Sequence, residues 1–197
     1  DPGDPTCILD APSDYLASLD QGVRGLRIGW SPDMGSLPVD PEVRHICEAA
    51  AKVFNELGAT VEEADFVLDH QQVRELFKTF WWSDYAANFE EMVASRREEM
   101  TTTFQTVIRK AGQWKVSRLA IALRELEWHR ARIAKIFHRF DLLLTPTLAT
   151  TAFPIDQRPG VIDGQPVDPY WGFTPFTYTF NMSGNTAASV PCGFSAD

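Results

Sequence analysis

The residues that could carry covalent chemistry in this chain are few and widely spaced. Hydrolysis of an acyl bond needs a nucleophile, a base that takes its proton, and donors that stabilise the oxyanion. Ser183 precedes Gly184, but the residues around it do not form the Gly-x-Ser-x-Gly turn of a nucleophilic serine. The four histidines fall on or beside expected helices without a local pairing to serine or cysteine: His45, His70, His129 and His138. The residue pattern alone therefore indicates no independent hydrolase.

Metal and cofactor sites have no sequence pattern here either. Glu125 and His129 are one helical turn apart, but no third ligand accompanies them at zinc-like spacing, and a helix salt link explains the pair better. P-loop and dinucleotide glycine patterns are absent. We expect no metal and no organic cofactor. The three cysteines, Cys7, Cys47 and Cys192, are odd in number and widely spaced, which favours reduced structural thiols in a cytoplasmic protein.

Composition restricts the partners and the size of the fold. The chain has 197 residues, 44% of them hydrophobic, which fits one domain with a buried core. Its net charge of −9 argues against nucleic acid or an anionic membrane as a partner, because both attract basic surfaces. No apolar run approaches the ~20 residues of a membrane-spanning helix.

The elements that would position a site begin with a β-α-β unit. Residues 26–30 form a short apolar strand, and residues 60–66 form a second one. Between them, Asp40 is a helix N-cap, Pro41 suits the first helical position, and Gly58 closes the helix. The two strands should be parallel, with a right-handed crossover. The Pro-rich residues 1–13 are expected to be a connector.

Helices fill the middle of the chain. An aromatic stripe predicts a long helix over residues 71–97, followed by helices over 101–110 and 116–139. The stripe is typical of core packing, although Trp81, Trp82 and Tyr85 could also wall an apolar pocket. In the last helix, five apolar residues are predicted to face inward: Leu119, Leu123, Leu126, Ile133 and Phe137.

The last third returns to strand patterns. Residues 141–147 contain three consecutive leucines, so we expect a strand covered on both faces, as in an α/β sheet. Residues 148–172 form a long loop rich in proline and glycine. Residues 174–194 read as a β-prone aromatic run, a tight turn at 183–185 and a short strand at 187–190. The fold class is therefore α/β, with a mixed, largely parallel sheet and flanking helices.

Three segments resemble the amidase signature family, whose members are serine hydrolases that cleave carboxamides. The first carries the family's Asn, Gly and Val-Pro-Cys-Gly positions, although Thr186 stands where the family usually has proline: Asn181, Gly184, Ala187, Val190, Pro191, Cys192 and Gly193. The second, residues 140–147, is similar to an apolar family strand that ends in Thr-Pro-Thr. The third comprises residues 23–30 and 41–61 and resembles the family's first strand and helix.

This resemblance implies a role in hydrolysing carboxamide C–N bonds. The family uses a serine, a second serine in a cis peptide and a lysine, but its Gly-Ser-rich segment is not in this sequence, so we transfer no catalytic residue. The resemblance implies that residues 1–197 are the C-terminal part of an amidase domain and supply scaffold and one wall of the pocket. The residues implied to bind substrate are Trp171, Phe173, Phe176, Thr145 and Asn181.

Two alternatives stay open at this point. The chain could be a non-catalytic α/β module for binding or assembly, or part of a glutamine-dependent amidotransferase A-type subunit, which shares the same signature. The expected partner is a small-molecule amide in the full-length enzyme. Unpaired strand edges also predict self-association, with a homodimer as one form.

Overall fold

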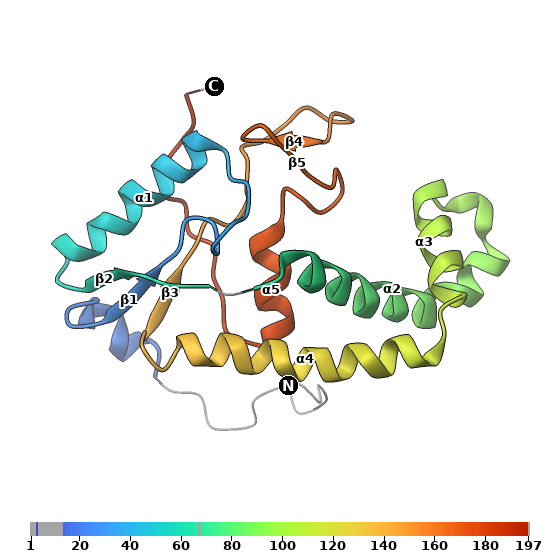
Figure 1. Ribbon diagram of the computed structural model, residues 1–197, viewed down its shortest axis with the longest axis horizontal. Helices are drawn as coiled ribbons and strands as arrows, with labels where there is room; N and C mark the ends of the chain where they lie inside the picture. The colour runs from blue at the N-terminus through green and yellow to red at the C-terminus, as the bar shows by residue number, and fades with distance from the viewer. Residues whose placement is uncertain (1–2, 4–13, 67, 197) are drawn as a thin grey trace.

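The fold is organised around a parallel sheet of three strands. The computed structural model describes residue 3, residues 14–66 and residues 68–196, so nearly all of the predicted connector 1–13 lies outside the described residues. The strands β1 (Arg27–Trp30), β2 (Thr60–Glu63) and β3 (Leu142–Leu144) have the order β2-β1-β3 (Figure 1). Ile28 of β1 lies opposite Val61 on one side and Leu142 on the other. The predicted α/β class is confirmed.

The β1-α1-β2 unit forms because its local signals agree. Helix α1 (Pro41–Glu56) begins at Asp40, whose side chain accepts a hydrogen bond from the Glu42 amide at 2.8 Å. After the helix, Gly58 has a φ of 90°, a left-handed conformation that other residues rarely adopt. In Figure 1, α1 lies along one face of the sheet.

The helical middle follows the predicted order. Helix α2 (His70–Ser95) packs against α3 (Thr102–Gly112) and against α4 (Val116–Ile136). A 3₁₀ turn, η2 (Arg97–Glu99), lies between α2 and α3, and another, η1 (Leu16–Gln21), precedes β1. Figure 1 shows α3 at the end of the molecule far from the sheet.

The predicted inward face of α4 is wrong in part. Ile133 is buried as expected, but Leu119 is 37% exposed and Leu123 is 52% exposed. Ala122 and His129 are buried instead, about three turns and one turn before Ile133. A small residue and a hydrogen-bonded imidazole therefore let α2 and α5 approach α4. Leu126 and Phe137 still pack against the hydrophobic clusters, so the prediction fails only at Leu119 and Leu123.

The predicted strand, turn and strand over residues 174–194 are also wrong. Residues Pro175–Ser183 form helix α5, which ends at Gly184 with a φ of 78°. The buried positions of α5 recur at helical spacing and outweigh the β propensity of the aromatic run: Pro175, Phe176, Tyr178, Thr179 and Met182. Residues 185–196, including the predicted strand 187–190, form neither helix nor strand.

The segments beside α5 differ from prediction in two further ways. The long loop 148–172 contains a small antiparallel hairpin, β4 (Val161–Ile162) and β5 (Gln165–Pro166), that buries Ile162. Strand β3 lies at an edge of the sheet, and Leu142 is 43% exposed rather than covered on both sides.

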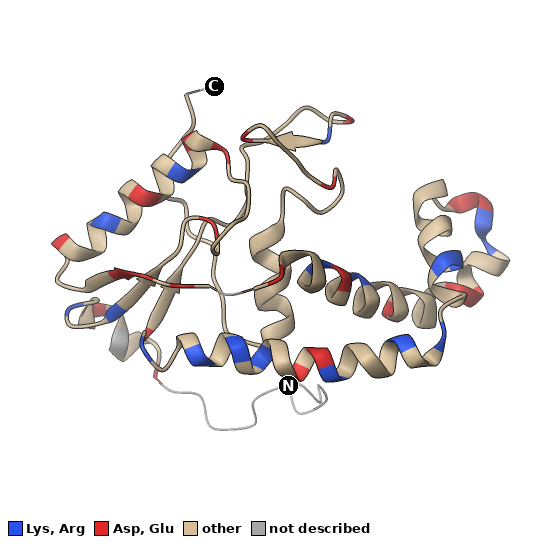
Figure 2. Ribbon diagram, viewed as in Figure 1, with Lys and Arg blue, Asp and Glu red and all other residues tan. Residues whose placement is uncertain are grey.

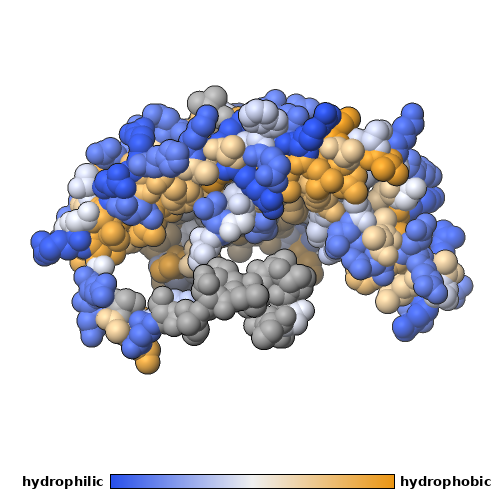
Figure 3. All heavy atoms as spheres, turned by 90° about the horizontal axis from the view of Figure 1, so that it is seen from below, coloured by the Kyte–Doolittle hydropathy of each residue, from blue (hydrophilic) through white to orange (hydrophobic). Residues whose placement is uncertain are grey.

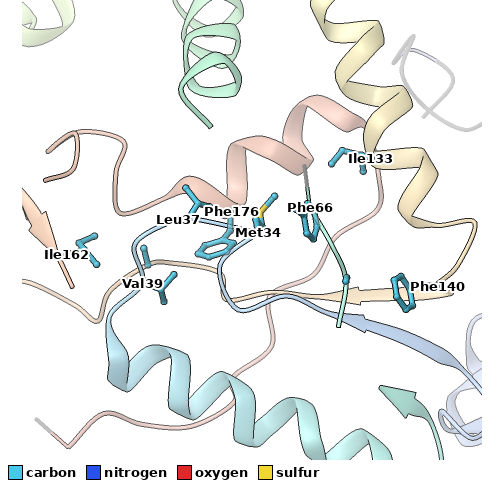
Figure 4. Packing of buried hydrophobic residues seen from close by; sticks show 10 residues of the cluster. Met34, Leu37, Val39, Phe66, Ile133, Phe140, Ile162 and Phe176 are labelled. Atoms are coloured by element: carbon cyan, nitrogen blue, oxygen red, sulfur yellow. The ribbon is translucent and has the colours of Figure 1, made fainter. Parts of the chain in front are cut away.

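Two hydrophobic clusters hold these elements together. Figure 4 shows the first, in which Met34, Leu37 and Phe176 lie near the carboxyl ends of the strands. It also includes Val39, Phe66, Ile133, Phe140 and Ile162. The second cluster joins α2, α4 and α5 through Val73, Leu76, Ala122, Tyr178 and Met182. Helix α5 contributes to both clusters.

The surface mixes charged and apolar side chains. Figure 2 shows basic residues spaced along α4 and acidic residues along β2. Figure 3, which views the molecule from below, shows hydrophobic areas between hydrophilic ones on that face. Within the described residues, none of the helices is long and apolar enough to cross a membrane.

Candidate functional site

An aromatic wall is built where the loop before α5 meets α2. Asp168 accepts hydrogen bonds from the amides of Tyr170 at 2.9 Å and Trp171 at 3.3 Å, which fixes the turn that carries Trp171. The Trp171 ring then meets Phe77 edge-on at 5.3 Å and Trp81 edge-on at 4.8 Å, measured between ring centroids. These rings are half-buried, so part of their surface remains open.

Tyr178 of α5 completes this aromatic wall, which we define as Phe77, Trp81, Trp171 and Tyr178. Its ring stacks on Phe77 with centroids 5.3 Å apart. Burial raises the pKa of Tyr178 to about 12, so its phenol stays neutral at physiological pH. The wall therefore presents apolar aromatic surface without a negative charge from this residue.

A second part of the site lies beyond the carboxyl end of β3. Thr147 and Ser189 are in contact there, with 3.1 Å between their hydroxyl oxygens, and both residues are exposed. Ligands of open parallel sheets bind beyond the carboxyl ends of the strands. We call Thr145, Thr147 and Ser189 the hydroxyl edge. The Ala149 amide donates to the Phe173 carbonyl at 3.0 Å and so ties this edge to the loop that carries Trp171.

The five residues predicted to bind substrate lie in different surroundings. Trp171 belongs to the aromatic wall, and Phe173 is half-buried with its ring edge-on to Phe153 at 5.0 Å. The Thr145 hydroxyl donates to the Pro146 carbonyl at 3.0 Å, and Asn181 is exposed on α5. Phe176 is only 1% exposed and packs in the first cluster, which favours a packing role for its ring.

The histidines do not assemble a catalytic pair within the described residues. His129 is 2% exposed and shares a hydrogen bond with the Thr179 carbonyl at 2.8 Å, which joins α4 to α5. Burial lowers the pKa of His129. The predicted link between His129 and Glu125 is not formed, because Glu125 accepts from the Gln72 amide group at 2.9 Å instead. His70 shares a hydrogen bond with the Met34 carbonyl at 3.0 Å, and burial lowers its pKa as well.

The arrangement can bind but shows no activated nucleophile among the residues that the structure describes. The Ser183 hydroxyl donates to the Phe180 carbonyl at 3.0 Å, and the Ser189 hydroxyl contacts that of Thr147. Neither of these partners is a general base that could take the proton of the serine. The described residues also include no group of three potential metal ligands. Aromatic surface and neutral hydroxyls suit an apolar molecule that carries a carbonyl or amide.

Sequence reasoning missed the contact between Thr147 and Ser189 and the turn at Asp168. Thr147 and Ser189 are 42 positions apart, so only a fold could bring them together. Both lie in segments that resemble the amidase signature family, which was the available signal. Asp168 precedes Pro169, a pair typical of turns.

Comparison with known proteins covers the whole chain. The chain is 31% identical over 202 residues to an acylamidase of Rhodococcus erythropolis, with 100% of this chain and 42% of that protein covered. It is 26% identical over 223 residues to the A-type subunit of the glutamyl-tRNA(Gln) amidotransferase of Alkaliphilus metalliredigens, with 100% of this chain and 44% of that protein covered. The crystal structure of a bacterial aryl acylamidase of the amidase signature family superposes with a TM-score of 0.83 at 28% identity, over 95% of this chain and 41% of that one.

The chain thus spans less than half the length of these relatives. Its fold is therefore shared with a solved amidase signature structure. The amidase family matches residues 1–197, and this protein therefore belongs to the amidase signature family.

Proposed function

We propose that this chain supplies the scaffold and one wall of the substrate pocket in an enzyme that hydrolyses carboxamides. The nucleophilic serine would come from a segment outside this sequence. The observation that carries the proposal is the aromatic wall and the hydroxyl edge, which the hydrogen bond between Ala149 and Phe173 links, in a chain that matches the amidase family throughout. In this arrangement Trp171 contacts the apolar part of a small amide, and the hydroxyl edge lies near its polar end.

Labelling with a fluorophosphonate probe tests where the nucleophile lies. The probe reacts with an activated serine whatever the natural substrate is. We expect no labelling of the 197-residue chain and stoichiometric labelling of the full-length gene product that contains it. Labelling of this chain at Ser183 or Ser189 would overturn the assignment of the nucleophile to another segment.

Substitution of Trp171 tests the wall. In the full-length enzyme, Trp171→Ala should raise KM for an aryl amide roughly 10-fold with a small change in kcat, because it removes apolar contact made before and during reaction. The matched control is Trp128→Ala, since Trp128 is 65% exposed on α4 and outside the aromatic wall. Equal effects of the two substitutions would contradict the proposed wall.

An amidotransferase of the A type is the second candidate, because one such protein is 26% identical to this chain. The two functions separate by substrate. An amidase releases ammonia or an amine from a simple aryl amide, whereas the amidotransferase uses glutamine as the ammonia donor. If the full-length protein turns over neither substrate and does not react with the probe, the non-catalytic binding or assembly module is favoured. We also propose that the protein is located in the cytoplasm.

A further inference from the structure

Two cysteines far apart in the sequence meet at α1. Cys47 lies on α1 and Cys192 in the segment that follows α5, 145 positions away, yet their sulfur atoms are 3.9 Å apart. Cys47 is half-buried and Cys192 is exposed. Neither residue belongs to the aromatic wall or to the hydroxyl edge, so the proposed function does not account for their contact.

Two further contacts hold the segment 192–196 against the same helix. A side chain at Gly193 would place its Cβ 2.5 Å from Cγ2 of Ile46, so the backbone there passes directly over α1. The Ala196 amide donates to the Glu42 carboxylate at 2.8 Å. Glu42 and Ile46 are one turn apart on one face of α1, and the segment therefore runs along that face towards the start of the helix.

We propose that Cys47 and Cys192 are an oxidative modification site, at which a reversible disulfide fastens the segment 192–196 to α1. A disulfide needs sulfurs about 2.05 Å apart. The approach from the present separation requires rotation of the Cys192 side chain and a small shift of a segment that is itself neither helix nor strand. The site does not depend on the proposed amidase function.

The reaction uses a small-molecule disulfide such as oxidised glutathione as the oxidant. The Cys192 thiolate attacks one sulfur of that disulfide, the S–S bond breaks, and one glutathione thiolate leaves with the bonding electron pair. Cys47 then loses its proton to solvent and attacks the Cys192 sulfur, which releases the second glutathione. In total, two protein thiols are oxidised and one glutathione disulfide is reduced to two thiols.

The surroundings assign the order of these two steps. Burial, together with the neighbouring Cys192 sulfur, raises the pKa of the Cys47 thiol to about 12. Cys47 is therefore a thiol at neutral pH, and the thiolate is the form that attacks a disulfide. The exposed Cys192 is the sulfur that the oxidant reaches first, and Cys47 resolves the mixed disulfide at short range.

The test uses the full chain with Cys7→Ser, because Cys7 lies outside the described residues. After incubation with oxidised glutathione, mass spectrometry should show the loss of two hydrogen atoms without bound glutathione, and peptide mapping should find Cys47 joined to Cys192. Closing so long a loop should raise the melting temperature on the order of 10 °C, and dithiothreitol should reverse the shift.

Single substitutions separate the two roles. Cys47→Ser should leave a stable glutathione adduct on Cys192, whereas Cys192→Ser should stay largely unmodified. Three outcomes would overturn the proposal: glutathione retained on the protein with both cysteines, a disulfide between two chains, or two free thiols after exposure to the oxidant. The mass measurement and the peptide mapping use the protein with both Cys47 and Cys192. A folding defect in one of the single variants would therefore not obscure the result.

Discussion

Replacing Phe176 with alanine distinguishes a core residue from a residue of the pocket. The Phe176 ring is 1% exposed and packs with Met34, Leu37 and Val39 in the first hydrophobic cluster (Figure 4). Truncation of a buried phenylalanine to alanine costs about 3–5 kcal/mol, through lost burial and the cavity that remains. Because this ring is almost fully enclosed, we expect a loss of about 4 kcal/mol in the free energy of unfolding.

Urea denaturation followed by circular dichroism measures this loss. For a chain of this size, ~4 kcal/mol corresponds to a fall in the melting temperature on the order of 10 °C. Phe194→Ala is the matched control, because Phe194 is 96% exposed and its removal should change stability by less than about 0.5 kcal/mol. Phe176→Leu should fall between the two, since leucine retains part of the apolar contact.

A small effect on stability would refute this reasoning. If the free energy of unfolding of Phe176→Ala is within about 1 kcal/mol of that of the unsubstituted chain, either the neighbouring side chains fill the cavity or the ring is not enclosed. If the same substitution also raised KM in the full-length enzyme without destabilising it, Phe176 would be a pocket residue, as the sequence alone suggested. Stability and KM together therefore decide between the two roles.

Three other predictions concern the sheet. Gly29→Ala should destabilise the chain by about 1–3 kcal/mol in urea denaturation, because the added Cβ would lie 2.8 Å from Cδ2 of Phe140. The Arg27 guanidinium and amide lower the pKa of Asp141 from 3.8 to about 2, so this contact stabilises the fold fully above pH ~4 and is lost as the pH falls towards 2. Asp141→Asn should therefore flatten the fall in melting temperature over that range, and an unchanged profile would contradict the assignment. Leu142→Lys should reduce self-association in light scattering, because Leu142 is 43% exposed on an edge strand, and a parent chain that is already monomeric would refute the expected homodimer.

Local signals predicted the first half of the fold well. The Asp40 cap, Pro41 and Gly58 determine the limits of α1 almost independently of the rest of the chain. The prediction for α4 failed because periodicity identifies apolar stripes but not the neighbours that cover them. There, Ala122 and His129 face α5, whereas Leu119 and Leu123 are exposed.

The misassigned segment 174–194 contained the signals of a helix as well. Pro175 occupies the first helical position, and Gly184 follows the last turn in the left-handed conformation, the usual asymmetry of helix ends. Aromatic residues alternating with threonines gave the opposite indication, because Phe176, Tyr178 and Phe180 would share one face of a strand. Tertiary packing decides between the two, and no local pattern contains that information.

The helical state of α5 also determines what its residues can do. A strand would place Thr179 and Asn181 on the same face, two positions apart, whereas a helix turns them apart by about 200°. Thr179 is accordingly fully buried, with its carbonyl bonded to His129, and Asn181 is exposed. One face of α5 thus holds α4 and the two hydrophobic clusters together, and the other leaves the Asn181 side chain exposed. The helical geometry therefore accounts for the burial of Thr179 and the exposure of Asn181 two positions later.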